Sequence, residues 1–396
     1  MQLNTSLFSE ENLRQYRVGG YHPVSIGDIF DGRYEVVRKL GFGQRATVWL
    51  VLDRRLNRHV ALKILKAKYY RSTKSIYKVK VLQYLKTSDL THSGRMFGID
   101  LLDSFSHLGP HGTHICMVLE PMHQDLAILS RRSHDRKIPL VIVKEIAKQM
   151  LLALDYLHTS CSIVHTDIQP QNILVSLRDE DFESYIRRYL QGNPQDLYDG
   201  EYGELPDYAI ASEHIPIELP KDPSQFTFKL SGLGVATWVD KSTTELIQAE
   251  PFRAPEVILG AKWNSSADIW NLGCLSWQIY TLAEGRNLFN GRNDPAGYFT
   301  SDEDHLCQII ELCGPVPMGY MRKGKHVSKY LDPTGKLVNI EQTYPVSLPQ
   351  IIKYWSPELS NEEIDEFSDF LDLMLQFHPK DRSAAREILN HAWLQT

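Results

Sequence analysis

The residues of this chain whose types and spacing suggest chemistry lie between His165 and Leu174, in the stretch HTDIQPQNIL. It places the carboxylate of Asp167 five residues before the carboxamide of Asn172, with a second carboxamide, Gln169, between them. A carboxylate can accept a proton from a hydroxyl group, and a carboxamide oxygen can bind a hard cation such as Mg²⁺. These side chains are therefore the first candidates for a catalytic site.

A second candidate site is the glycine-containing stretch from Leu40 to Val48, LGFGQRATV. Gly41 and Gly43 have no side chains, so backbone N–H groups there can approach the phosphates of a ligand. Taken alone, two glycines in a hairpin usually make only a turn. Lys63 follows in the sequence VALK and could supply a cation, although it is equally compatible with an exposed lysine on an alternating strand.

The apolar pattern predicts the elements that position these residues. A period of two, typical of half-buried strands, occurs at Tyr34, Val36 and Leu40, at Val48, Leu50 and Leu52, and at Val60, Leu62 and Ile64. A spacing of three and four, typical of an amphipathic helix, leads to His165 through Val143, Ile146, Ala147, Met150, Leu151, Leu154 and Leu157. Strands early and helices later predict an α+β fold with a small β-rich lobe and a larger helical lobe.

The composition is that of an ordinary globular protein, with 396 residues, 42% of them hydrophobic and 23% charged. A formal charge of -6 offers no basic surface, so no direct nucleic-acid partner is expected. No apolar run is long enough for a membrane span, and residues 1–17 lack the apolar core of a signal peptide. We therefore expect an intracellular protein, in the cytoplasm, the nucleus or both. Its five scattered cysteines indicate neither a disulfide framework nor a zinc site.

Residues 178–223 interrupt the helical pattern with many acidic residues and five prolines. We interpret this stretch as a mobile surface insertion.

Several further motifs show that the chain resembles the protein-kinase superfamily, and more narrowly the SR-protein kinases and their fungal relatives. The motifs are GGYHP at 19–23, RY at 33–34, KLG at 39–41, TVWL at 47–50, HICMV at 114–118, HTDI at 165–168, APE at 254–256, DIWNLG at 268–273, DEDH at 302–305 and IIEL at 309–312. The resemblance runs from about Tyr16 to the C-terminus.

The resemblance implies a bilobal protein-kinase fold. Residues 1–30 would be an N-terminal extension that packs on the small lobe, and 31–120 the antiparallel-sheet N-lobe. Residues 121–396 would be the large, mainly helical C-lobe, with the acidic spacer at about 178–223 and an inserted helical region at about 286–350.

In such a fold, Asp167 would accept the proton of the substrate hydroxyl and Asn172 would hold Mg²⁺ on the phosphates of ATP. The implied nucleotide-binding residues are Leu40, Gly41, Gly43, Val48, Ala61, Lys63, Leu119, Glu120, Met122 and Leu174. The carbonyl of Glu120 and the N–H of Met122 would pair with adenine. Without the resemblance, residues 115–122 are equally compatible with a core strand that ends at Pro121.

The resemblance also implies structural and docking residues. Glu256 would pair with Arg382, and Asp268 would begin the central helix of the large lobe. Asp304 and Glu311 match acids of a groove that docks arginine-rich peptides, although they could equally be helix-surface carboxylates. Arg286 falls where another acid is expected, and its charge should weaken such docking. The expected partner is a protein substrate, with Arg/Ser-rich segments as the candidate class, and the chain is expected to be a monomer without membrane contact.

Three positions depart from the family pattern. Gly232 occupies the place of the aspartate that binds the metal between the β and γ phosphates. Lys78 occupies the place of the glutamate that orients Lys63, and Gln169 replaces a lysine that neutralises the transferred phosphoryl group. With Thr166 in place of an arginine, no guanidinium is present to bind an activation-loop phosphate.

Two hypotheses follow from these observations. The first is a serine/threonine kinase with impaired catalysis, and the second is a pseudokinase that acts as a binding or scaffolding module. A purely structural protein with coincidental motifs would require many ordered matches to be accidental.

Overall fold

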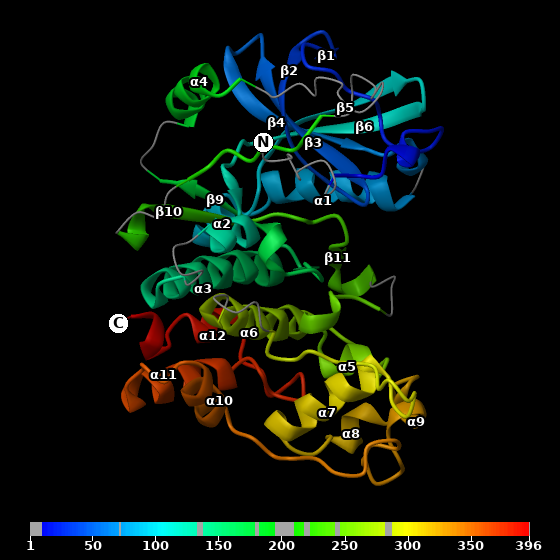
Figure 1. Ribbon diagram of the computed structural model, residues 1–396, viewed down its shortest axis with the longest axis vertical. Helices are drawn as coiled ribbons and strands as arrows, with labels where there is room; N and C mark the ends of the chain where they lie inside the picture. Colours follow the sequence, from blue (N-terminus) through cyan, green and yellow to red (C-terminus); the bar gives the residue numbers. More distant parts are fainter. Residues whose placement is uncertain are drawn as a thin grey trace, which may run out of the picture.

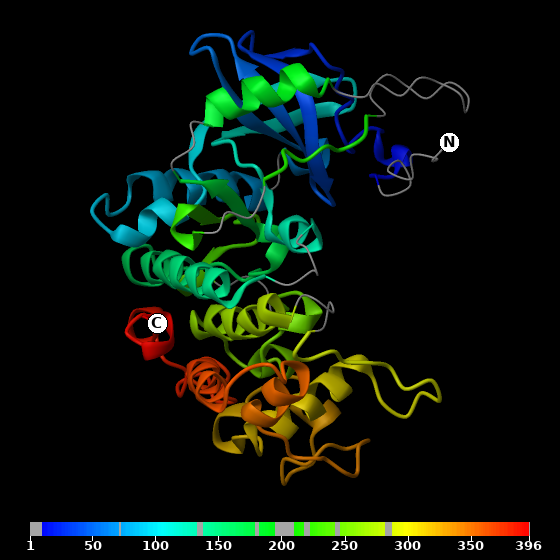
Figure 2. The ribbon, with the colours of Figure 1, turned by 60° about the vertical axis from the view of Figure 1, so that its left-hand side comes forward.

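The computed structural model describes residues 10–70, 73–132, 138–178, 182–194, 210–217, 222–241, 246–281 and 287–395. A β-rich N-lobe stands above a larger helical C-lobe (Figures 1 and 2). The α+β, bilobal prediction is therefore confirmed.

The N-lobe is built on a six-stranded sheet in the order β1-β2-β3-β4-β6-β5, within the described part of the chain. Every neighbouring pair is antiparallel. The strands are β1 (Ile29–Phe30), β2 (Tyr34–Gly43), β3 (Ala46–Asp53), β4 (Arg58–Leu65), β5 (Leu101–Gly109) and β6 (Gly112–Leu119), and helix α1 spans Thr73–Thr87.

The alternation of apolar residues gives this sheet two packed faces. On one face, a hydrophobic cluster is formed by Val36, Trp49, Val51, Val60, Leu62, Ile64 and Val118, together with residues of the N-terminal segment. On the other face, Ala46 and Leu65 join the large core that continues into the C-lobe. The sheet is therefore buried on both sides over much of its area.

The C-lobe contains short strands and helices. One small sheet has the order β10-β9-β7, from β7 (Gln124–Asp125), β9 (Ile173–Leu177) and β10 (Phe226–Leu230), and a second pairs β8 (Ile163–Val164) with β11 (Thr237–Trp238). The helices are α2 (Leu126–Arg132), α3 (Leu140–Asp155), α5 (Pro255–Ile258), α6 (Ser266–Thr281), α7 (Ser301–Cys313), α8 (Met318–Met321), α9 (Val327–Tyr330), α10 (Leu348–Trp355), α11 (Asn361–Asp372) and α12 (Ala385–Ile388), and the insertion between β9 and β10 carries α4 (Phe182–Gly192).

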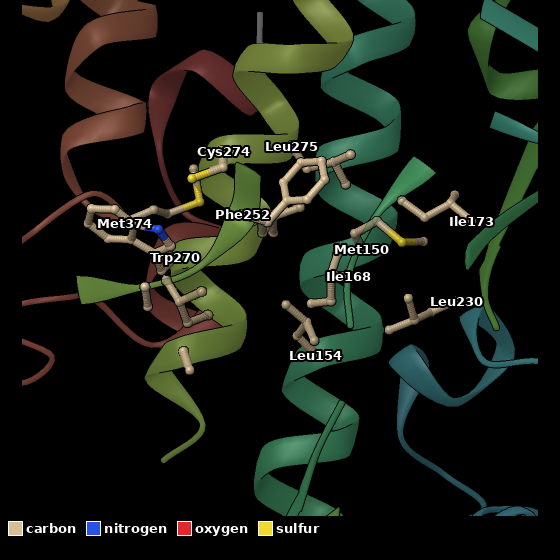
Figure 3. Close-up of a cluster of buried hydrophobic side chains, with 14 of the residues drawn as sticks. Met150, Leu154, Ile168, Ile173, Leu230, Phe252, Trp270, Cys274, Leu275 and Met374 are labelled. Atoms are coloured by element: carbon tan, nitrogen blue, oxygen red, sulfur yellow. The ribbon is translucent and has the colours of Figure 1, made fainter. Parts of the chain in front are cut away.

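The core of the C-lobe lies directly behind the segment that carries Asp167. Ile168 is 1% exposed and lies among Met150 and Leu154 of α3 and Phe252 (Figure 3). Because Ile168 is packed in this way, the backbone next to it cannot shift without opening a cavity.

The described parts of the 178–223 insertion include a helix that packs on the N-lobe, and the mobility of the insertion stays a prediction. Helix α4 lies beside the sheet of the N-lobe, and its Ile186 packs with Ile215 and Leu50 of β3, all fully buried (Figures 1 and 2). The signal was present in the sequence, because the apolar residues Phe182, Tyr185, Ile186, Tyr189 and Leu190 follow the three-and-four spacing of a helix.

Candidate active site

Asp167 lies at the centre of the site, and both neighbouring carboxamides bind it. The Nε2 of Gln169 donates to Asp167 Oδ1 at 2.9 Å, and the Nδ2 of Asn172 donates to Asp167 Oδ2 at 2.9 Å. A further bond at 2.8 Å joins Asn172 Nδ2 to the Asp167 carbonyl. The three candidate catalytic residues therefore form one hydrogen-bonded group.

Burial raises the pKa of Asp167, although the charge of His165 and the hydrogen bonds from Asn172 and Gln169 act in the opposite direction. A carboxylate with a raised pKa is a stronger base than an exposed one, which suits proton acceptance from a hydroxyl.

The backbone of this segment is held by a fully buried carboxylate on α6. Asp268 accepts hydrogen bonds from the N–H groups of His165 at 2.7 Å and Thr166 at 2.8 Å. Thr166 has a left-handed φ of 70°, an uncommon conformation for a β-branched residue that costs roughly 1–3 kcal/mol. Its hydroxyl donates to the carbonyl of Val235 at 3.0 Å, which helps to offset this strain. Thr166 therefore joins the catalytic segment to the activation segment.

Several of the proposed nucleotide-binding residues are neighbours across the strands of the N-lobe sheet, whereas Leu174 lies on β9 and Met122 in the connector. Direct cross-strand partners are Gly41 and Val48, Val48 and Lys63, and Ala61 and Leu119. Leu40, Val48, Leu119 and Leu174 are each partly exposed, whereas Ala61 and Met122 are buried. This set of apolar side chains beside one lysine fits an adenine ring with its phosphates.

The side chain of Lys63 forms no hydrogen bond or ion pair with any residue that the structure describes. Burial, and then the charge of Arg45, lower the pKa of its ammonium group. Lys78 belongs to helix α1, but its side chain lies outside the described residues. Lys63 is partly exposed, and its ammonium group has no partner among the described side chains, as a phosphate-binding lysine would require.

The connector between the lobes is fixed by an ion pair. Lys229 Nζ binds both carboxylate oxygens of Glu120, at 2.7 and 2.8 Å. Within the described chain, the carbonyl of Glu120 and the N–H of Met122 form no backbone hydrogen bond. Both groups therefore remain available to an adenine edge.

Gly232 has a φ of +80°, and an added Cβ would overlap the amide of Asn172, with Nδ2 at 2.7 Å. The Asn172 side chain thus occupies space next to the position where the family has a carboxylate. No group of three potential metal-binding side chains of the His, Cys, Asp and Glu types occurs among the described residues. One neutral oxygen, Asn172 Oδ1, does not fit the donor set of a Mg²⁺ ion that bridges phosphates.

Comparison with known proteins identifies the family. The model of the family described as "Protein kinase domain" matches residues 34–187 and 217–394. The chain belongs to the protein-kinase family. It is 36% identical over 400 residues to "Serine/threonine-protein kinase SRPK" of Physarum polycephalum, and the matched region covers 97% of this chain and 91% of that protein. It is 33% identical to "Protein kinase dsk1" of Schizosaccharomyces pombe, over 98% of this chain and 85% of the relative. With "SRSF protein kinase 3" of Homo sapiens the identity is 28%, over 97% of this chain and 90% of the relative. The chain is therefore an SRPK-like serine/threonine kinase by family, and such kinases generally use ATP and Mg²⁺.

The structural residues of this kinase form a buried ion pair. Arg382 Nη1 and Nη2 each donate to a different carboxylate oxygen of Glu256, both at 2.7 Å, and both side chains are 0% exposed. The pair joins the end of the activation segment to the last part of the C-lobe.

The two candidate docking acids lie on α7 and bind neighbouring loops. Asp304 Oδ2 accepts from the N–H of Arg292 at 2.9 Å, and Glu311 Oε1 accepts from the N–H of Tyr344 at 2.8 Å. Each carboxylate is partly exposed and keeps an oxygen for a basic ligand. Arg286 lies outside the described residues.

Two positioning features of the kinase were missed in the sequence. Gln248, with a φ of 69°, donates its N–H to the carbonyl of Thr166 at 3.0 Å, and it accepts from the N–H of Ala254 at 2.8 Å. His123, next to the connector, packs edge-on against Phe182 and Tyr185 of the insertion. The contacts of Gln248 with Thr166 and of His123 with the insertion have no local sequence signal, because each joins segments far apart in the chain.

Proposed function

We propose that this protein binds ATP in the cleft between its lobes and transfers the γ-phosphoryl group slowly to serine or threonine hydroxyls of a protein. The observation that carries the proposal is the group of Asp167, Gln169 and Asn172, hydrogen-bonded together on a backbone that Asp268 fixes. Bound ATP would supply the phosphoryl group.

In this proposal Asp167 orients the substrate hydroxyl and accepts its proton. Burial raises the pKa of Asp167, so the carboxylate is more basic than an exposed one. Gln169 donates a hydrogen bond to Asp167 and carries no charge, so it stabilises a phosphoryl group less than a lysine would. Loss of this charge and of the carboxylate at residue 232 should slow transfer by several orders of magnitude.

The proposal is tested by phosphoryl transfer from radiolabelled ATP to a serine-containing protein substrate. The Asp167→Asn variant should lose about 10²- to 10⁴-fold in rate, since general-base catalysis contributes that much. Asp369→Asn, at an exposed carboxylate of α11, is the matched control and should keep the rate of the natural chain. Equal rates for the natural chain and Asp167→Asn would contradict the proposal.

We further propose that basic, Arg/Ser-rich segments are the substrate class. The support is the pair of partly exposed acids, Asp304 and Glu311, on one helix, and the name of the related "SRSF protein kinase 3". Binding of an arginine-rich peptide should weaken in Asp304→Asn/Glu311→Gln, and a neutral peptide should show no change. Equal affinity of the natural chain and the double variant for the arginine-rich peptide would rule out this docking surface.

A second candidate function, a pseudokinase that binds without turnover, is favoured by the geometry at Gly232. An aspartate there must adopt the left-handed conformation and displace the Asn172 amide. If the second candidate is right, the natural chain transfers no phosphate above the Asp167→Asn background, and Gly232→Asp/Lys78→Glu gains activity. Measurable transfer by the natural chain alone would exclude it.

A further inference from the structure

Arg45 lies at the tip of the glycine-containing hairpin. Gly43 of β2 pairs with Ala46 of β3, so the turn between them consists of Gln44 and Arg45 alone. Arg45 is exposed, and its side chain leaves the sheet at the edge that faces the C-lobe. The hairpin thus presents a guanidinium group next to the backbone N–H groups of the glycine-containing stretch.

The backbone of this hairpin is tied on both sides. The hydroxyl of Tyr21, in the N-terminal segment, donates to the carbonyl of Gly43 at 2.7 Å. The N–H of Lys66 donates to the carbonyl of Arg45 at 2.9 Å, and Ala46 is 3% exposed within the core. The tip therefore cannot lift easily, and the position of the Arg45 Cα is fixed by the fold.

The Arg45 side chain reaches across to the activation segment. Its Nη1 donates to the carbonyl of Gly234 at 3.4 Å, a contact between the two lobes. The guanidinium also lies close enough to act on both charged residues of the site. The charge of Arg45 is the second cause, behind burial, of the lowered pKa of Lys63. The same charge acts to lower the pKa of Asp167, against the effect of burial, which raises it.

The charged side chains of the site are those of Lys63, Arg45 and Asp167, together with His165 beside Asp167. Gly232 brings no carboxylate, and Gln169 is neutral. In most protein kinases the acidic side chains of this site repel phosphate, and Mg²⁺ ions offset that repulsion. Here the cations of Lys63 and Arg45 accompany the carboxylate of Asp167, so a triphosphate would have less need of a metal ion for charge balance.

We propose that Arg45 and Lys63 bind the triphosphate of ATP directly and without Mg²⁺, with Arg45 supplying positive charge in place of the metal ion and of the lysine that Gln169 replaces. This inference rests on the proposed ATP binding in the cleft. On binding, Arg45 exchanges its long hydrogen bond with the Gly234 carbonyl for a stronger, charge-assisted one to phosphate.

The test is equilibrium binding of ATP and of adenosine to the full chain by calorimetry, in EDTA and in Mg²⁺. The natural chain should bind ATP in EDTA within about threefold of its affinity in Mg²⁺. Arg45→Gln should bind ATP about 10- to 100-fold more weakly in EDTA, as expected for loss of a charge-assisted hydrogen bond, with adenosine affinity unchanged. Arg58→Gln, at another exposed arginine of the same sheet, is the matched control.

Each outcome decides the matter. ATP binding that requires Mg²⁺ would overturn the inference and leave the proposed kinase function standing. Arg45→Gln binding as tight as that of the natural chain would show that Arg45 is only a surface arginine. No ATP binding under either condition would overturn both the inference and the proposed function. An unchanged unfolding temperature of Arg45→Gln without ligand shows that a loss of affinity does not come from misfolding.

Discussion

Replacement of Lys39 by methionine should destabilise the whole N-lobe, because this lysine joins three separate segments. Its Nζ is bound to Glu10 at 2.9 Å, to Glu11 at 2.7 and 2.8 Å, and to the carbonyl of Ile210 at 2.8 Å. The lysine side chain is 1% exposed, and those of Glu10 and Glu11 are 12% and 3% exposed. Lys39→Met would leave two carboxylates close together and almost without solvent.

Removing one partner of a buried ion pair costs about 3–5 kcal/mol. The entropy of unfolding is about 2.1 cal/mol/K per residue, so the cooperative unfolding of 396 residues has an entropy of roughly 0.8 kcal/mol/K. The midpoint of thermal unfolding should therefore fall by about 4–6 °C.

The assay is thermal unfolding at pH 7, followed by circular dichroism. Lys39→Met/Glu10→Gln/Glu11→Gln should recover most of the loss, because neutral amides do not repel one another. Lys80→Met, at an exposed lysine of α1, is the control and should change stability by less than about 0.5 kcal/mol. A Lys39→Met midpoint equal to that of the control, or a triple variant no more stable than the single one, would refute the reasoning.

Three further predictions concern other parts of the molecule. Arg382→Met should lower the free energy of unfolding in urea by about 3–5 kcal/mol, and Arg382→Met/Glu256→Leu should recover most of it. Burial, with the charges of neighbouring histidines, lowers the pKa of His22 to about 3. Below about pH 6.5 the unfolded chain then binds more protons than the folded chain, so the free energy of unfolding should fall as the pH drops. In His22→Phe this fall should be smaller, by up to about 1.4 kcal/mol per pH unit. Ile186→Ala should cost about 2–5 kcal/mol and speed proteolysis within the insertion.

Each of these predictions has a contrary outcome. Equal stability of Arg382→Met and the double variant would show that the unpaired Glu256 carboxylate carries no cost. A His22→Phe variant with the acid sensitivity of the natural chain would assign that sensitivity to other groups, such as His107 and His114, which lie against His22. Unchanged proteolysis of Ile186→Ala would mean that α4 is held without its central contact.

Much of the fold followed from local patterns. The strands β2, β3 and β4 and the helix α3 were predicted from periodicity, because each of these elements needs an apolar face to pack. Helix α4 was not predicted, since the prolines and charges of the acidic insertion obscure its apolar side. That face is buried only because Leu50 and Ile215 lie opposite it, and no local pattern shows this.

The sequence by itself determined the class of fold, the membership in the protein-kinase family and the short segment that brings Asp167, Gln169 and Asn172 together. These features rest on short motifs and local apolar patterns, within each of which the residues are a few positions apart and spacing fixes geometry. The tertiary structure decided that Arg45 reaches Gly234, 189 residues away, and that Lys39 meets Ile210 across 171 residues. It also decided that Asn172 fills the space beside Gly232. Such contacts form when packing of the lobes brings distant segments together, and local sequence patterns do not predict them.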